Sequence, residues 1–523
     1  MIGYAFLQIA VLVGAAFAKS ILYSQATIVG WNEQQKQIEI TRNGSLLIID
    51  DRIKRIFKNA EDVNYPRGTE VIDAAGKIIT PGFIDTHRHN WQAGWRTMGS
   101  NITIVDYLHR NLAPERTKFI TPEDIYNAQL YGAYEGLSVG TTTSLEHAHH
   151  TWTKANGEAG LRASLDSGAR IYHAYALGMI GYGVSIQEQV DHYHEIASTY
   201  HKELDKSIVE LGIACDVFSA LPEPALEPIL NILRTEEVPV LTMHMLSGPY
   251  GMSNNPAIMD KLGLLNRSMP VVFSHASFMN DEEADILRKT NQYASITIES
   301  EMFIGQTNPT AHKWLDQAAL GVDSFWTFSS DLLTQIRIFL AYIRHTIFTE
   351  VLSRWELPAN SPLSASQAFI MATRSGALAL RRPDLGIIAE GAKADILVWK
   401  TDSMTMLGWW DPVAAIVNFA TVNDIEDVLV DGVFKKRNGK LLVKDLQQAK
   451  AKFLETAEKF RAAVLATPQL ALKGDEKFFS GAPIVTVPRL DVLRGAGDGR
   501  ETIDEATAMF AAQGRAKAEH DEL

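Results

Sequence analysis

The 523-residue chain has a single cysteine, Cys215, which excludes an intrachain disulfide framework and a cysteine-rich zinc knuckle. It has no long run of lysine and arginine, and its formal net charge is −13. Nucleic acid and anionic membrane surfaces are therefore not expected as partners. Beyond residues 1–18, no segment is long and apolar enough to span a bilayer. If the protein binds a metal, the ligands must be histidine and carboxylate side chains.

The two ends of the chain resemble address signals. Residues 1–18 form an apolar stretch that closes on a small-x-small site, which is typical of a secretory signal peptide although no basic residue precedes the stretch. A first strand or helix of the fold is the alternative for this segment. The last four residues are HDEL, an endoplasmic-reticulum retention address. Together they predict the lumen of the endoplasmic reticulum, with no stable membrane insertion after signal removal; secretion or a cytoplasmic location is the alternative.

The hydrophobic content of 46% is ample for a large core and more than one domain. Short strand-like segments with turn residues between them occur before residue 81 and again after residue 384, and these two groups could pair into one small β-domain. Between them, apolar runs alternate with segments of helical periodicity. The predicted divisions are a signal peptide at 1–18, a composite β-sandwich from 19–80 and 385–445, a barrel at 81–384, and a helical extension with a tail at 446–523.

The alternating region predicts parallel βαβ units, and eight such units predict a closed (β/α)8 barrel. The first strand ends in the sequence PGFIDTHRH. The other seven predicted strands are TTTSLEHA (141–148), RIYHAYAL (170–177), VELGIACDVFS (209–219), PVLTMHML (239–246), PVVFSHAS (270–277), YASITIES (293–300) and VDSFWTFSSD (322–331).

Histidines and one aspartate fall at the carboxyl ends of four of these strands. His87 and His89 end the first strand, His244 lies on the fifth, His275 on the sixth, and Asp331 ends the eighth. Residues i and i+2 of a strand share a face, so both imidazoles of the first pair can point at one spot. Barrel enzymes keep their chemistry at this end, and imidazole with carboxylate is the usual ligand set of a catalytic zinc or iron.

The pattern His-x-His occurs twice more, and neither copy is as informative. His192 and His194 lie in a segment with helical periodicity, where residues i and i+2 point about 200° apart, so we interpret them as a solvated helix face. His147 and His149 follow the second strand at the correct end of the barrel. His147 could line a substrate pocket, and a plain loop is the equal alternative.

These motifs together resemble the amidohydrolase superfamily, in the branch similar to cytosine and guanine deaminases, S-adenosylhomocysteine deaminases and atrazine chlorohydrolase. Three closing segments agree with this resemblance: TRSGALAL (373–380), EGAKADILV (390–398) and VLVDGVF (428–434). The resemblance extends from about residue 20 to residue 445. It implies a hydrolase that uses a metal-held hydroxide to attack a non-peptide C–N bond in a small-molecule substrate, of the cyclic amidine or N-heterocycle type.

Carried over residue by residue, the resemblance assigns His87, His89, His244 and Asp331 to one divalent metal, Zn²⁺ ahead of Fe²⁺. It assigns to Asp331 the additional role of general base and then acid, and to His275 a contact with the metal-held water or the substrate. Members with two metals use a carboxylated lysine on the fourth strand. Residues 208–219 contain no lysine, so a mononuclear site is predicted. Relatives often dimerise, which leaves a homodimer as one expected state.

The chain departs from the family pattern three residues after His244. Deaminases of this branch carry a proton-shuttling glutamate there, whereas this chain has Ser247, which cannot take that role. Glu301 on the seventh strand is the predicted replacement, with Glu299 two residues before it facing the same mouth; a salt-bridged barrel rim is the alternative. The missing glutamate keeps amide, lactone or chloride hydrolysis open as other chemistries, and a non-catalytic scaffold is a third hypothesis.

The segment directly after the first histidine pair supplies weaker candidates. Trp91, Gln92 and Arg96 could form an aromatic and cationic substrate wall. A packed loop helix is the alternative, because tryptophan is mostly a core or interface residue.

Overall fold

The computed structural model describes residues 19–59, 63–110, 117–324, 328–466 and most of 472–490, together with residues 504, 507 and 508. The predicted signal peptide and the terminal HDEL lie outside the described residues. Within the described part of the chain, no helix combines the length and apolar character needed to cross a membrane.

Eight parallel strands form a nearly closed barrel in which sequence order is spatial order. Their residues are almost all buried, as expected for strands covered on both faces. The strands are β6 (Phe83–Arg88), β7 (Thr141–Ala148), β8 (Arg170–Leu177), β9 (Val209–Cys215), β10 (Leu241–Leu246), β12 (Val271–Ser277), β13 (Tyr293–Ile296) and β14 (Ala318–Leu320). The two-residue strand β11 (Met252–Ser253) pairs with β10 outside the barrel.

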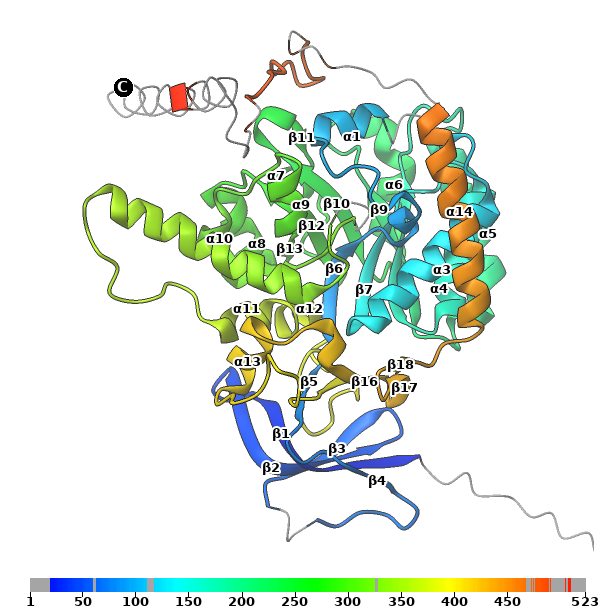
Figure 1. The fold of residues 1–523 in the computed structure, drawn as a ribbon. Coiled ribbons are helices and arrows are strands. Elements are labelled where there is room, and N and C mark those ends of the chain that lie inside the picture. The colour runs from blue at the N-terminus through cyan, green and yellow to red at the C-terminus, as the bar shows by residue number, and fades with distance from the viewer. Residues whose placement is uncertain are drawn as a thin grey trace, which may run out of the picture.

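Helices connect successive strands and surround the barrel (Figure 1). Several begin with a side-chain cap; the Thr121 and Asp124 pair at the start of α3 forms a reciprocal capping box. The connecting helices are α3 (Pro122–Ser138), α4 (Lys154–Ser167), α5 (Ile186–Leu204), α6 (Glu223–Thr235), α7 (Pro256–Lys261), α8 (Asp281–Thr290), α9 (Ile298–Phe303) and α10 (Leu332–Ser353).

The last strand of the barrel, β14, ends next to the first strand, β6, at the His-x-His segment. The backbone amides of Val322 and Asp323 both donate to the carbonyl of His87, at 3.2 and 2.8 Å. Gly321 is required at this junction, because a Cβ there would lie 2.9 Å from the backbone nitrogen of His87. The residues immediately after β14 are therefore held against the end of β6.

Strands from both flanks of the barrel pair into one nine-stranded sheet, seen below the barrel in Figure 1. Strand β5 joins the two halves, since it pairs with β1 on one side and with β15 on the other. The strands are β1 (Ser20–Asn32), β2 (Gln37–Ile49), β3 (Arg52–Phe57), β4 (Glu70–Asp73), β5 (Ile78–Pro81), β15 (Ile396–Trp399), β16 (Ile425–Val430), β17 (Val433–Arg437) and β18 (Lys440–Leu441). The predicted fold class, a barrel with a composite β-domain, is confirmed.

Helix α14 (Leu446–Ala466) runs along the outside of the barrel next to α3 (Figure 1). Phe453 stacks on Tyr131 of α3 with ring centroids 3.8 Å apart, and Phe460 is buried against Trp95. Trp95 belongs to the short helix η2 (Asn90–Trp95), which directly follows His89. Helix α14 therefore supports the segment that carries the first histidine pair. The remaining helices are α1 (Ile104–Arg110), α11 (Ala365–Met371), α12 (Arg374–Ala379) and α13 (Pro412–Asn418).

The predicted strands correspond closely to the observed ones in the first six units and differ in the last two. The segment predicted as a strand over 293–300 leaves the sheet at Ile296 and continues as α9. The segment predicted over 322–331 is not the eighth strand. Its place in the barrel is taken by β14, Ala318–Leu320, whose pairing with β13 is parallel.

Candidate active site

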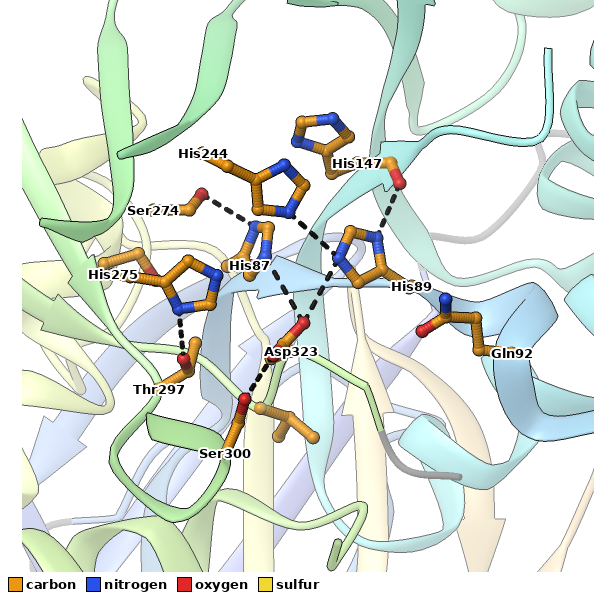
Figure 2. A network of polar contacts seen from close by, with 12 residues as sticks. His87, His89, Gln92, His147, His244, Ser274, His275, Thr297, Ser300 and Asp323 are labelled. Atoms are coloured by element: carbon orange, nitrogen blue, oxygen red, sulfur yellow. Dashed lines mark hydrogen bonds and ion pairs between the residues drawn. The ribbon is translucent and has the colours of Figure 1, made fainter. Parts of the chain in front are cut away.

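Side chains alternate between the two faces of β6, so His87 and His89 lie on one face and Arg88 lies on the other. His87 and His89 point together into the end of the barrel (Figure 2), with ring centroids 4.7 Å apart. The side chain of Arg88 is buried elsewhere, where it donates to Asp85 Oδ2 at 2.8 Å and to Asn90 Oδ1 at 2.8 Å. The buried guanidinium is thus neutralised by a carboxylate and does not approach the imidazole pair.

His244 of β10 and Asp323, just after β14, complete a cluster with the first pair. His244 Nε2 lies 3.3 Å from His89 Nε2, and Asp323 Oδ1 lies 3.2 Å from His89 Nε2 and 3.6 Å from His87 Nε2. Figure 2 shows the three rings and the carboxylate converging on one point. Four potential ligand atoms from three distant parts of the sequence therefore lie within reach of one ion.

Hydrogen bonds behind the rings determine which nitrogen faces this point. Nδ1 of His89 lies 2.8 Å from the carbonyl oxygen of His147, and Nδ1 of His244 lies 2.8 Å from Asp216 Oδ2. Both acceptors require a proton on Nδ1, so both Nε2 atoms carry lone pairs. These two Nε2 atoms, 3.3 Å apart, cannot hydrogen-bond to each other, because neither carries a proton. His87 Nδ1 lies 2.7 Å from Ser274 Oγ, a hydroxyl that can either accept from it or donate to it, and the buried Nε2 of His87 has no hydrogen-bond partner among the described residues.

These orphaned nitrogens fit a divalent cation. Three imidazole nitrogens and one carboxylate oxygen match the ligand set of a catalytic zinc or iron, and backbone or carboxylate partners on the opposite nitrogen are the usual support of such ligands. Burial lowers the pKa of His87 and of His89, which keeps both rings neutral, as a metal requires. His244 differs: burial lowers its pKa, but Asp216 and then Asp323 outweigh burial and the net pKa is raised.

Asp323 takes the position that the sequence analysis assigned to Asp331. Burial raises the pKa of the Asp323 carboxyl, but contacts with His87 and His89 outweigh burial and hold that pKa well below its usual range. Its other oxygen accepts a hydrogen bond from Ser300 Oγ. Asp331 instead precedes α10 and caps it, accepting from the backbone amide of Thr334 at 2.7 Å. The placement of Asp331 among the ligands was wrong because the eighth strand ends at Leu320, eleven positions before that residue.

His275 joins the cluster from β12 with an unusual backbone. Its φ is +70° and that of Ala276 is +52°, a left-handed conformation that side chains rarely adopt and that is concentrated at functional sites. Nδ1 of His275 lies 2.8 Å from Thr297 Oγ1, and the ring lies 5.1 Å from that of His87, centroid to centroid. Nε2 therefore faces the cluster (Figure 2). The predicted location of His275 at the mouth agrees with the structure.

Glu301 and Glu299 do not face the mouth together, because they lie on helix α9 and not on a strand. Glu301 is fully buried behind His275: its Oε1 accepts from the amide of Thr297 at 2.9 Å and lies 3.6 Å from His275 Nδ1. Glu299 accepts from the hydroxyl of Ser329, at 2.5 Å. Neither carboxylate lines the cavity at the barrel end. The prediction that Glu301 directly replaces the missing glutamate therefore does not match its position.

A second carboxylate, Asp216, does line the cavity and was missed by the sequence analysis. It follows β9 and accepts at Oδ1 from the backbone amide of His244 at 2.7 Å, in addition to the ring contact. Its Oδ2 also lies 3.3 Å from His147 Nε2. Burial raises its pKa, but His244 and His147 outweigh burial and hold that pKa well below the usual range. His147 is thus buried behind the cluster and does not line the cavity.

Glu146 is a further buried carboxylate near the site that the sequence pattern did not indicate. Its oxygens accept from the backbone amide of Asn90 at 2.9 Å and from the Asn90 side chain at 2.5 Å. Burial raises the pKa of Glu146 to about 8. The carboxylate fixes the residue after His89 and so helps to hold the first histidine pair in place.

Two of the three weaker candidates after His89, Trp91 and Gln92, belong to the packed helix η2, which is the alternative stated for them, and Arg96 directly follows that helix. Trp91 is fully buried and donates from Nε1 to His149 Nδ1 at 3.1 Å. Gln92 donates to the hydroxyl of Tyr107 at 2.5 Å, one layer behind the cavity. Arg96 forms an ion pair with Glu135 outside the cavity. The predicted aromatic and cationic substrate wall is therefore not formed by these residues.

A cavity of about 210 Å³ opens directly over the cluster. One end is lined by His89, His244, His275, Asp216 and Asp323. The His149 ring stacks on His89 with centroids 4.0 Å apart and forms part of the same wall. A small molecule that enters this cavity therefore meets the converging ligand atoms on one side only.

Comparison with known proteins agrees with this geometry. The model of the amidohydrolase family matches residues 78–435, which span strand β5, the whole barrel and strands β15 and β16. Among curated proteins, the 5-methylthioadenosine/S-adenosylhomocysteine deaminase of Dictyoglomus turgidum is 26% identical over 420 residues, covering 77% of this chain and 92% of that protein. The enzyme with the same name from Thermococcus sibiricus is 28% identical over 384 residues, covering 69% and 83%.

Solved structures share the fold at lower sequence identity. The zinc complex of atrazine chlorohydrolase from Arthrobacter aurescens superposes with a TM-score of 0.70 at 21% identity, covering 84% of this chain and all of that one. A zinc-bound adenosine deaminase from Xanthomonas campestris gives 0.72 at 16% identity, covering 85% and 99%. Guanine deaminase from C. acetobutylicum with bound guanine gives 0.66 at 20% identity, covering 80% and 100%.

Proposed function

The chain belongs to the amidohydrolase family, and from that premise we propose that it deaminates a small cyclic amidine or amino-substituted N-heterocycle with one divalent metal. The observation that carries the proposal is the convergence of three imidazole Nε2 atoms and the Asp323 carboxylate on one point. Zinc fits this donor set, and iron is the alternative. The names of the related deaminases support the choice of bond, because the attacked carbon in such substrates carries an exocyclic amine.

His87, His89, His244 and Asp323 would hold the ion. When bound, a divalent cation there supplies Lewis acidity to a water molecule and to the substrate. Asp323 accepts a proton at a carboxylate oxygen that faces the cavity and can return it later, the role that the sequence analysis gave to Asp331. His87 and His89 hold the pKa of Asp323 well below its usual range, which keeps this carboxylate ionised.

His275 and the groups behind it provide a second proton-handling unit. Thr297 Oγ1 donates to Glu301 Oε1 at 3.3 Å, so Nδ1 of His275 donates to Thr297 and Nε2 is left for the cavity. The neutral ring accepts a hydrogen bond at Nε2, and the protonated ring donates one to a developing oxyanion or leaving amine. Glu301 supplies the counter-charge for the protonated ring. It would thus act through His275, as a positioning residue, without touching the substrate.

One feature favours a second chemistry on the same site. Ser247 stands where deaminases of this branch carry glutamate, and its buried hydroxyl has no hydrogen-bond partner among the described residues. A hydrolysis that expels a leaving group without prior protonation, such as chloride displacement, needs no acid at that position. We rank this candidate second because the unit formed by His275, Thr297 and Glu301 can handle a proton.

The test combines metal analysis with product detection. The purified chain should bind about one zinc or iron per molecule and release ammonia from at least one member of a purine, pyrimidine and pterin panel. His244→Asn should abolish both, whereas His194→Asn, an exposed histidine paired with Glu236 on the barrel's outer surface, should change neither. A chain that binds no metal refutes the proposal, and metal binding with chloride release but no ammonia supports the second candidate.

A further inference from the structure

The cavity has two ends of opposite character. Five of its residues belong to the reactive cluster described above, and side chains from six segments form the rest of the wall: α1, the segments after β7 and β8, the end of β10 with β11, and the segments after α9 and β14. These are mainly aliphatic or aromatic and include Ile104 and Leu108 of α1, Ile180 after β8, Ile304 after α9 and Phe328. Ile104 and Ile304 are buried together in a small hydrophobic cluster separate from the barrel core. The wall is therefore a preformed apolar surface opposite the reactive groups.

The described residues of this wall include no lysine or arginine. Its only carboxylates are Asp216 and Asp323, both at the reactive end and both already engaged by histidines. The other polar groups of the wall are uncharged, and they are Tyr107, Tyr182, Gln306 and Ser324. A charged group on a ligand would therefore lose water on entering and find no unengaged opposite charge among the described residues, which is strongly unfavourable. Arg96, the one cation that the sequence placed near the mouth, is paired with Glu135 elsewhere.

We propose that the substrate carries, opposite the bond that is hydrolysed, an uncharged apolar group that packs against this wall. The proposal rests on the proposed function for the identity of the reactive end. It separates substrates that share a reactive ring but differ in what the ring carries. A thioether or alkyl substituent is accepted, whereas a substituent that ends in a carboxylate or an amino acid is rejected.

The test uses metal-directed probes, so that it does not depend on knowing the substrate. Three hydroxamates share a head that binds zinc and differ only at the far end of the ring: 4-methylbenzohydroxamate, 4-carboxybenzohydroxamate and 4-(aminomethyl)benzohydroxamate. Their affinities for the zinc-loaded full chain are measured by isothermal titration calorimetry. The methyl compound should bind at least about ten-fold more tightly than either charged compound, because only its end group is matched by the wall.

A substitution at the rim tests whether the wall itself causes the preference. Ile180 lines the cavity and is 61% exposed, so Ile180→Arg can be accommodated without unfolding the core. This variant should bind the carboxylate probe several-fold more tightly than the parent does and reduce the gap between the two probes. Leu357→Arg is the matched control, since Leu357 is 87% exposed and does not line the cavity. It should leave the ratio unchanged.

The possible failures can be told apart. A chain without stoichiometric zinc contradicts the proposed function. A zinc-loaded chain that binds the charged probes as tightly as the methyl probe, or binds none of the three, overturns the apolar-wall inference and leaves the metal site standing. The inference is also overturned if Ile180→Arg and Leu357→Arg change the probe ratio equally.

Discussion

Two aspartates follow the last barrel strand, and substituting each by asparagine separates their roles. Asp323 Oδ1 lies 3.2 Å from His89 Nε2, within the proposed metal site. Asp331 accepts from the amide and the hydroxyl of Thr334, at 2.7 and 3.0 Å, and starts α10. We expect Asp323→Asn to lose the metal and Asp331→Asn to retain it.

The structure sets the size of both effects. Carboxylates that only support a ligand contribute about 10–100-fold to metal affinity, so removal of the one carboxylate ligand should cost at least about 100-fold. At about 1.4 kcal/mol for each ten-fold change, this is about 2.8 kcal/mol of binding free energy. Asn is as good a helix cap as Asp, so Asp331→Asn should change the free energy of unfolding by less than about 0.5 kcal/mol.

The assay is a competitive zinc titration against a chromogenic chelator, with urea unfolding of the metal-free proteins as the stability control. Asp323→Asn should fold like the parent and show the weakened zinc affinity, with activity lost in proportion at limiting zinc. The reasoning is refuted if Asp331→Asn loses zinc while still folded, or if Asp323→Asn binds zinc with the affinity of the parent.

Four further expectations follow from the packing around the site. Asp216→Asn should weaken zinc binding by about 10–100-fold, because it removes the carboxylate that orients the β10 histidine; unchanged affinity would exclude that role. Glu301→Gln should lower kcat by about ten-fold or more with little change in KM and should shift the pH profile of kcat/KM, whereas Glu299→Gln should leave that profile in place. Burial lowers the pKa of His150 to about 3, so the neutral ring stabilises the folded state above pH 6.5 and this contribution falls as the pH drops towards 3. The melting temperature of the metal-free protein should accordingly fall between pH 7 and 5, and less so in His150→Gln; equal slopes would contradict this. Phe460→Ala should reduce the free energy of unfolding by about 3–5 kcal/mol in urea titrations, since the ring is fully buried against η2. A loss below about 1 kcal/mol would show that the contact between α14 and η2 does not stabilise the fold.

Local sequence pattern was sufficient wherever a strand was long and bounded by turn residues. The segments 141–148 and 170–177 are strands with the predicted bounds, and the family and enzyme class inferred from the motifs are confirmed by the match over residues 78–435. The His-x-His pair was interpretable because the period of a strand fixes which side chains share a face. No tertiary information was needed for either step.

The last two strands could not be located in this way. Strand β14 contains only Ala318, Ala319 and Leu320, too short for any alternation to be visible. The aromatic segment that follows it has a stronger β pattern and was therefore predicted as the eighth strand. For this reason the metal-binding carboxylate was expected at Asp331 and not at Asp323. Only pairing with β13 and the hydrogen bonds to His87 identify the true strand, and both are long-range contacts.

Asp216 shows a different limit: the start of its strand was predicted correctly, and the predicted strand extended four residues beyond the observed end at Cys215. An aspartate after a buried strand has the same local pattern whether it binds a metal, orients a ligand or faces solvent. What distinguishes it is its distance from His244 and His147, which are far away in sequence. Its role is therefore a property of the closed barrel.

The serine at position 247, where related deaminases have glutamate, is also explained by contacts between residues that are far apart in sequence. In this chain the carboxylate that can support proton transfer lies behind the β12 histidine, on α9, and not after the β10 histidine. Thr297 links the two, with its hydroxyl 2.8 Å from His275 Nδ1 and 3.3 Å from Glu301 Oε1. The other oxygen of Glu301 has no hydrogen-bond partner among the described residues, and a carboxylate buried in this way is costly unless an opposite charge lies nearby. We therefore propose that His275 and Glu301 together handle the proton for which other deaminases of this branch use the glutamate that is absent at Ser247.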